Sequence, residues 1–251
     1  MTPIDHAFLD CPLAHRGLHD RSERRIENSP AAFRAAIAAG YGIECDLQLS
    51  CDGQAMVFHD EVLDRLTAES GTVNLRSRSE LAEIRLTGSE DTIRPLADIL
   101  TLVAGRVPLL IEIKDQDGRL GPGVGALERA TAEALAGYAG PVAVMSFNPH
   151  AIAAFHAAAP KVPVGLVTCD FNAADWPDVA QDRLRALRAM PDLDRVGAGF
   201  ISHDRADLAS AHVAAARAAG RAVLCWTVRS SAQEAAARKY ADNITFEGYF
   251  A

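Results

Sequence analysis

The chain has 251 residues, of which 49% are hydrophobic and 23% are charged, so it can bury a core and is not disordered. Its net charge is −8, and Lys and Arg form no continuous run, which argues against nucleic acid or an anionic membrane surface as the main partner. The length suits one large domain of the size of an α/β barrel.

The cysteines and the apolar runs indicate where the protein works. The five cysteines are scattered and never spaced C-x-x-C, which favours reduced thiols in the cytosol over a disulfide framework or a zinc site. The N-terminus lacks the basic and apolar regions of a signal peptide, and no apolar stretch is long enough to span a bilayer. We therefore expect a cytoplasmic protein with no stable membrane insertion.

Short β-like runs alternate with Ala-rich helical runs along most of the chain. We predict eight strands, at residues 12–15, 42–49, 108–114, 142–147, 162–169, 199–202, 222–228 and 243–246. The predicted helices cover residues 31–39, 96–103, 149–158, 176–190, 207–219 and 231–240. For the first helix, Ser29 is an N-cap, Pro30 takes the first helical position and Gly40 ends the helix.

Regular alternation of strands and helices indicates parallel strands, and eight closing units make a TIM (β/α)8 barrel. A doubly wound open sheet is the structural alternative, but the Gly-x-Gly-x-x-Gly pattern that would support it is absent. Residues 55–60 follow an Asp52-Gly53 turn and resemble the return arm of a hairpin. Residues 61 to about 95 are polar and predict a small insertion after the second strand. We expect residues 1–251 to form a single catalytic barrel domain.

Two predicted strands carry pairs of charged residues. Glu44 and Asp46 stand at i and i+2 in the second strand, so both point to one face, and Glu112 and Lys114 repeat this spacing in the third strand. Adjacent carboxylates on an apolar strand are costly to bury unless a positive charge lies between them, and a divalent cation is the simplest such partner.

Further polar residues end the first strand and the hairpin arm. His15 and Arg16 end the first strand, and His59 ends the arm. Each of these residues alone also fits a structural role, such as an ion pair or a cap. Together they indicate a site, because apolar strands do not usually direct so many charges inward.

The chemistry of the set selects among possible sites. Three carboxylates suit a hard cation, Mg²⁺ or Ca²⁺, better than zinc. Two histidines beside such a cation can act as base and acid near neutral pH, while Arg and Lys bind an anion. The combination favours phosphoryl transfer by acid–base catalysis.

Six motifs, in this order, resemble those of the glycerophosphodiester phosphodiesterase family. They are His15-Arg16-Gly17, Glu27-Asn28-Ser29, Glu44-x-Asp46, His59-Asp60, Glu112-x-Lys114 and Trp226-Thr227-Val228, and they extend over nearly the whole chain. The resemblance implies a TIM barrel with a small insertion after the second strand, in agreement with residues 61–95.

The resemblance also implies a role for each residue. Glu44, Asp46 and Glu112 would bind one divalent cation, Mg²⁺ or Ca²⁺. His15 and His59 would form the acid–base pair, and Arg16 and Lys114 would hold the phosphate. Glu27 and Asn28 would line the metal and phosphate site. Trp226 would flank the glycerol end, although by its own sequence it fits a barrel-filling role equally well.

Two segments depart from the family pattern. The closing strand reads Thr245-Phe246-Glu247-Gly248-Tyr249 where Thr-Asp-x-Pro is common, and Ser202-His203-Asp204 ends the sixth strand. We expect both segments on the side of the mouth away from the metal, where they would loosen selectivity for the alcohol. We expect His203 to be a capped loop residue.

The sequence thus predicts a metal-dependent phosphodiesterase that converts small-molecule glycerophosphodiesters to glycerol 3-phosphate and an alcohol. Two alternatives stay open: a related lyase or phospholipase of the same barrel type that forms a cyclic phosphate, and a non-catalytic barrel that binds phosphate esters. A homo-oligomer is also compatible with the sequence.

Overall fold

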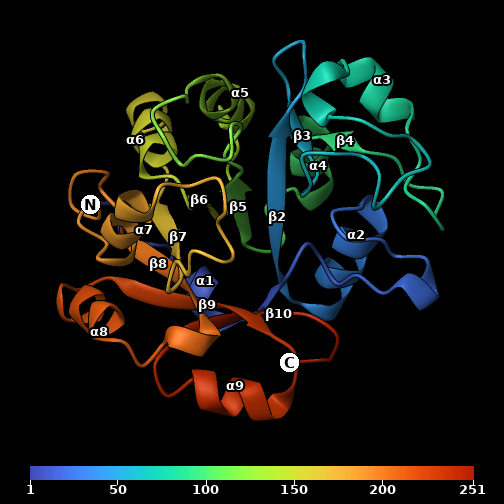
Figure 1. Ribbon diagram of the computed structural model, residues 1–251. Coiled ribbons are helices and arrows are strands. Elements are labelled where there is room, and N and C mark those ends of the chain that lie inside the picture. The colour runs from blue at the N-terminus through green and yellow to red at the C-terminus, as the bar shows by residue number, and fades with distance from the viewer.

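Eight parallel strands close into a barrel in the computed structural model, which describes residues 1–251 (Figure 1). In their order around the barrel the strands are β1 (Leu13–Ala14), β2 (Gly42–Leu49), β5 (Leu109–Ile113), β6 (Val142–Ser146), β7 (Val164–Thr168), β8 (Phe200–Asp204), β9 (Ala222–Val228) and β10 (Asn243–Phe246). Pairing of β1 with both β10 and β2 closes the ring. The predicted TIM (β/α)8 barrel is confirmed.

Helices surround the strands on the outside of the barrel (Figure 1). They are α2 (Pro30–Ala39), α4 (Leu96–Val103), α5 (Ala126–Leu135), α6 (Pro149–Ala158), α7 (Gln181–Arg188), α8 (Ala211–Ala218) and α9 (Ser231–Ala237). As predicted, Ser29 caps α2 by accepting a hydrogen bond from the Ala32 N–H at 3.2 Å, and Gly40 ends it in a left-handed conformation. None of the helices combines the length and the apolar character needed to cross a bilayer.

A small substructure follows β2. The end of β2 pairs with antiparallel β3 (Ala55–Val57), and β3 pairs with β4 (Arg94–Pro95). The turn η2 (Val73–Leu75) and the short helix α3 (Arg78–Glu83) lie between β3 and β4. This region has its own apolar cluster, which includes Met56, Phe58 and Leu63, and it stands beside the mouth of the barrel.

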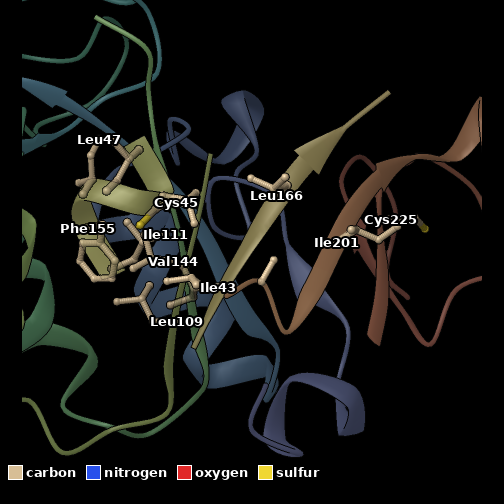
Figure 2. Close-up of a cluster of buried hydrophobic side chains, with 14 of the residues drawn as sticks. Ile43, Cys45, Leu47, Leu109, Ile111, Val144, Phe155, Leu166, Ile201 and Cys225 are labelled. Atoms are coloured by element: carbon tan, nitrogen blue, oxygen red, sulfur yellow. The ribbon is translucent and has the colours of Figure 1, made fainter. Parts of the chain in front are cut away.

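Alternation of side chains along the strands builds two separate cores. The outward-facing residues, among them Ile43, Cys45 and Ile111, pack against the helices (Figure 2). The inward-facing residues fill the barrel, and they include Leu13, Leu110, Ala143, Phe200 and Leu224. In a TIM barrel this filling makes the interior a packed core rather than a pore.

The N-terminal segment closes the amino end of the barrel. Phe8, from α1 (Ala7–Asp10), is fully buried among the inward-facing residues. The Asn243 side-chain amide of β10 donates hydrogen bonds to the backbone carbonyls of Phe8 and Cys11, at 2.7 and 2.6 Å. With this end plugged, only the carboxyl ends of the strands are open for a site.

Several helices differ from the prediction. The short helices α1 and α3 were not predicted, α8 begins at Ala211 rather than at residue 207, and α9 ends at Ala237 rather than at residue 240. The largest differences concern α5 and α7. No helix was expected between residues 114 and 142, yet α5 lies there. It was not predicted because its start carries no Ser, Thr, Asp or Asn cap. Instead the Glu128 carboxylate accepts a hydrogen bond from the Gly125 N–H at 2.5 Å. The helix expected at residues 176–190 begins only at Gln181. Pro177 directly follows Trp176 and disfavours a helical conformation there.

The expectation that His203 is a capped loop residue is wrong. Strand β8 continues through His203 to Asp204, two residues beyond the predicted end. His203 is fully buried, and its Nδ1 lies 2.7 Å from the Thr168 hydroxyl of β7, the residue with which it is in register. This hydrogen bond explains how a histidine fits a buried strand position.

Removal of the Phe8 ring should destabilise the protein without touching the mouth of the barrel. Phe8→Ala should lower the free energy of unfolding by about 3–5 kcal/mol, because a fully buried ring leaves a cavity. Urea denaturation followed by circular dichroism measures the change. Phe250→Ala is the matched control, since Phe250 is 76% exposed, and it should cost less than about 0.5 kcal/mol. Equal effects of the two changes would contradict the plug.

Candidate active site

A cavity with about 190 Å³ of free space opens at the carboxyl ends of the strands. Six of the residues predicted from the sequence line it: His15, Arg16, Glu44, His59, Glu112 and Lys114. Trp226 also lines it, from β9. The fold therefore brings residues from β1, β2, β5, β9 and the end of the hairpin arm to one opening.

The three predicted metal-binding carboxylates lie together. Asp46 of β2 is in register with Glu112 of β5, and Glu44 precedes Asp46 by one full strand period. One oxygen from each carboxylate lies within 4.8 Å of the other two, and all three residues are buried. Burial, reinforced by the charges of Asp46 and Glu112, raises the pKa of Glu44 well above its usual value.

Two cations only partly offset this negative charge. The Lys114 ammonium lies 2.8 Å from Asp46 and 2.7 Å from Glu112. Burial alone would raise the pKa of Asp46, but Lys114 and its other positive neighbours hold it well below the usual range. Glu44 forms no ion pair with Lys or Arg, and its carboxylate accepts only a backbone hydrogen bond, from the Arg16 N–H at 2.9 Å.

The composition of the cluster fits a hard divalent cation. All its donors are carboxylate oxygens, which Mg²⁺ and Ca²⁺ prefer, and no Cys or His lies among them. Burial and the charges of Asp46 and Glu112 raise the pKa of Glu44, and no Lys or Arg side chain forms an ion pair with it. A bound cation would supply the missing positive charge.

Arg16 and Asn28 reach the cluster through unusual backbone conformations. Both residues have positive φ values, 55° and 58°, which side-chain-bearing residues seldom adopt. The buried Asn28 amide donates to Asp46 at 2.9 Å and accepts a hydrogen bond from the Asp46 N–H at 3.2 Å. The Arg16 Nε is buried without a hydrogen-bond partner, 3.4 Å from an Asp46 oxygen. Asn28 therefore fixes Asp46, and the Arg16 guanidinium lies between Asp46 and Glu27.

Carboxylates hold both histidines by Nδ1. His15 Nδ1 lies 2.5 Å from a Glu247 oxygen, and His59 Nδ1 lies 2.7 Å from an Asp60 oxygen. Since a carboxylate only accepts, Nδ1 carries the proton in each ring and Nε2 is left for chemistry. The His15 Nε2 lies 4.0 Å from Glu44, on the side of the acidic cluster. Burial lowers the pKa of His15, which favours the neutral ring, although the Glu247 hydrogen bond opposes this shift.

The region after β3 contributes Arg65, which joins two of these groups. Its guanidinium donates to Glu27 at 2.7 and 2.8 Å and to Asp60 at 2.6 and 2.8 Å. Glu27 also accepts from Arg16 at 2.6 Å. Burial alone would raise the pKa of Glu27, but the two arginines lower it to about 2. Glu27 is therefore an ionised support behind Arg16, and it is not among the residues that line the cavity.

Trp226 belongs to an aromatic cluster at one side of the opening. Its ring packs edge to face on Phe147 at 5.6 Å, and Phe147 also contacts Trp176 at 5.1 Å. The indole N–H of Trp226 donates to the Ser202 carbonyl at 3.0 Å. Trp226 therefore presents an apolar wall to the cavity and is also a packing residue.

The expectation that both departing segments lie away from the metal is wrong for Glu247, whereas Ser202 and Thr245 of these segments line the cavity. Glu247 directly contacts His15 instead of lying on the far side of the mouth. Tyr249 packs against Phe246 with its hydroxyl group on Glu234, and His203 faces away from the barrel interior. None of the three lines the cavity, so they give no basis for loose selectivity toward the alcohol.

Sequence reasoning missed Glu247 and Arg65 as site residues. Glu247 directly follows the last strand, so the rule that strand ends carry function could have found it. Arg65 lies in the polar region after β3, where one arginine among several gives no signal of its contacts.

The closed parallel barrel thus carries an acidic cluster that could hold a hard cation, beside two histidines that carboxylates orient. The sequence pattern of the Glycerophosphoryl diester phosphodiesterase family matches residues 15–243, so the chain belongs to this family of enzymes, which hydrolyse glycerophosphodiesters.

Individual relatives agree with this membership. A glycerophosphodiester phosphodiesterase of Bacillus altitudinis is 31% identical over 197 residues, covering 74% of this chain and 76% of that protein. A "Probable glycerophosphodiester phosphodiesterase 1" of Mycobacterium tuberculosis is 35% identical over 98 residues, but this match spans only 35% of its length.

Solved structures share the fold. A phosphodiesterase of Oleispira antarctica, in complex with the product sn-glycerol-3-phosphate, superposes with a TM-score of 0.77 at 23% identity. The match covers 96% of this chain and 94% of that chain. At this identity the likeness concerns the barrel.

Neutralising Glu44 should stabilise the metal-free protein. Burial raises the pKa of Glu44 in the folded protein, so above the ordinary pKa of a glutamate this carboxyl group opposes folding. Glu44→Gln should therefore raise the free energy of unfolding in EDTA at neutral pH. Saturating Mg²⁺ or Ca²⁺ should make the wild type more stable than Glu44→Gln. A protein that binds the ion gains about 2.7 kcal/mol of stability at an ion concentration of 100 times its Kd. Thermal unfolding with and without the ion measures both effects.

Glu83→Gln is the control for this prediction, because Glu83 is an exposed carboxylate on α3. Glu83→Gln should leave the unfolding temperature unchanged, both in EDTA and in the presence of the ion. An unchanged wild-type unfolding temperature across millimolar Mg²⁺ and Ca²⁺ would count against the cation site.

Proposed function

We propose that this chain hydrolyses glycerophosphodiesters to glycerol 3-phosphate and an alcohol, as a single barrel domain that depends on Mg²⁺ or Ca²⁺. The observation that carries the proposal is the cluster of three buried carboxylates, two cations and two carboxylate-held histidines at one cavity, which Glu44 and Glu112 line and Asp46 does not. The glycerol 3-phosphate bound to the Oleispira protein supports the choice of product. The five free cysteines favour a cytoplasmic location.

In this proposal Glu44, Asp46 and Glu112 hold the cation. A bound ion would neutralise charge on the phosphoryl oxygens and lower the pKa of the nucleophile. Asn28 positions Asp46 through two hydrogen bonds. A bound ion would share with Lys114 the neutralisation of Asp46 and Glu112.

Arg16 and Lys114 bind the phosphate of the substrate. The Arg16 side chain lines the cavity, and its guanidinium is held by Glu27, which Arg65 in turn supports. Lys114 reaches the cavity from β5 with three donors, of which two are occupied by carboxylates. Trp226 forms the apolar wall beside the organic part of the substrate.

The two histidines move the protons. His15, whose pKa is lowered by burial, is neutral at pH 7 and accepts a proton from the nucleophile at Nε2. His59, held by Asp60 at Nδ1, acts as the acid in its doubly protonated form and donates its Nε2 proton to the departing alkoxide. Each Nδ1 hydrogen bond fixes the ring orientation, as the third member of a catalytic triad does.

Turnover and its dependence on the ion test the proposal directly. The purified chain should release choline and glycerol 3-phosphate from glycerophosphocholine with Mg²⁺ or Ca²⁺, and EDTA should abolish the reaction reversibly. Phosphorus NMR follows the products and would detect a cyclic phosphate. Undiminished turnover in EDTA would contradict the metal site, and absence of turnover with either ion would contradict the function.

The pairing of Glu247 with His15 should appear in a double-mutant cycle. General acid–base groups contribute roughly 10²–10⁴-fold, so His15→Ala should lose activity on that order. Glu247→Gln should lose roughly 10- to 100-fold in kcat with little change in KM, because the ring loses its anionic partner. In the His15→Ala background, Glu247→Gln should cost less than about 2-fold, because Glu247 acts through His15.

Glu234→Gln is the matched control, since the side chains of Glu234 and Glu247 are both 19% exposed and Glu234 lies outside the cavity. It should keep wild-type kcat. Losses that simply multiply in the His15→Ala, Glu247→Gln double variant would show that the two residues act independently.

A further inference from the structure

Arg229 is a charged residue of the cavity that the proposed reaction does not use. It directly follows β9, and it lines the cavity together with six other ionisable residues: His15, Arg16, Glu44, His59, Glu112 and Lys114. The Arg229 side chain is 55% exposed, whereas those of the other six residues are between 2% and 29% exposed. Arg229 therefore stands at the open end of the cavity, and the groups assigned to the chemistry lie deeper.

Hydrogen bonds on both sides fix the position of Arg229. Its backbone N–H donates to the side-chain carbonyl of Gln233 at 2.8 Å, and the N–H of Glu247 donates to the carbonyl of the preceding residue, Val228, at 3.0 Å. The Arg229 Nε then donates to Glu247 Oε1 at 2.7 Å, while Glu247 Oε2 lies against His15. The two oxygens of one carboxylate thus hold the Arg229 guanidinium and the His15 ring.

The guanidinium held in this way keeps most of its donors free. An arginine has five N–H donors, and Glu247 accepts only the one at Nε. The four donors at the Nη atoms form no hydrogen bond within the protein. The only carboxylates that line the cavity are Glu44 and Glu112, which belong to the buried cluster. A half-exposed guanidinium with free Nη donors is suited to bind a carboxylate or another planar anion.

We infer that Arg229 determines which alcohol the enzyme accepts, by binding an anionic group, such as a carboxylate, on the alcohol of the substrate. This inference rests on the proposed function, in which Arg16 and Lys114 bind the phosphate deeper in the cavity. The alcohol is the part of the substrate that varies in size, so it needs the open end, where Arg229 stands. A neutral or cationic alcohol would leave the Nη donors to water.

A purely structural role for Arg229 makes a different prediction. Because Arg229 also holds Glu247, its removal could slow the reaction through His15, whatever the alcohol is. Recognition of the alcohol would instead change the relative rates of two substrates. The test must therefore compare substrates that differ by the anionic group alone.

Glycerophosphoserine and glycerophosphoethanolamine provide this comparison. Both alcohols carry an ammonium group, only serine adds a carboxylate, and both diesters release glycerol 3-phosphate, so one assay measures kcat/KM for each. The wild type should favour glycerophosphoserine. Arg229→Gln should lower the ratio of the two kcat/KM values roughly 3- to 10-fold, as expected for a partly exposed charge-assisted contact. Added salt should shrink the wild-type ratio, because it screens exposed charges.

Two further variants sharpen the test. Arg229→Lys keeps the positive charge but loses the planar fork of donors, so it should retain part of the preference. Arg238→Gln is the matched control, because Arg238 also donates from Nε to a glutamate, Glu234, at 2.7 Å and is 38% exposed, but it lies outside the cavity. This control should keep the wild-type ratio.

The outcomes separate this inference from the proposed function. A ratio that is the same in the wild type and in Arg229→Gln would overturn the inference alone. An equal fall of both rates would belong to this outcome, and it would show that Arg229 acts only through Glu247. A wild type that turns over neither diester, with Mg²⁺ or with Ca²⁺, would instead contradict the proposed function.

Discussion

Three carboxylates buried on neighbouring strands are the constraint on which the rest of the site depends. Glu44, Asp46 and Glu112 point into the barrel, where water cannot solvate them fully, and Lys114 neutralises only two of them. Removing like charges from water costs several kcal/mol per ion unless opposite charge accompanies them. The protein thus keeps a deficit of positive charge at Glu44. This deficit both attracts a cation and explains why the anionic substrate needs Arg16 close by.

Each of the two histidines is held by a hydrogen bond from its Nδ1 to a carboxylate, and the two carboxylates come from different segments of the chain. Glu247 follows the last strand and Asp60 follows the hairpin arm, yet each accepts a hydrogen bond from Nδ1 of its histidine. Arg65 extends the support from Asp60 to Glu27. The segment after β3 therefore links His59 to Arg16 through a chain of charged hydrogen bonds that runs by way of Asp60, Arg65 and Glu27.

How much of this could be predicted from the sequence depends on the range of each interaction. The spacing of Glu44 and Asp46, and of Glu112 and Lys114, sets the face of a strand locally, so both pairs were predicted to face inward together, and they do. The helix α5 escaped prediction because its N-terminal cap depends on a glycine backbone rather than on a usual capping residue. The contact of Glu247 with His15 joins residues 232 positions apart, which no local pattern encodes.

Closure of the barrel brings residues from distant parts of the chain to one cavity. Most of its charged residues come from β1, β2, β5 and the hairpin arm, and Arg229, which follows β9, adds a further positive charge. The rest of the lining includes apolar side chains and the hydroxyl-bearing residues Ser202, Thr227 and Thr245. Because the three carboxylates lie on the adjacent strands β2 and β5, substitutions on β6, β7 or β8 would change the apolar lining without removing any of these buried charges.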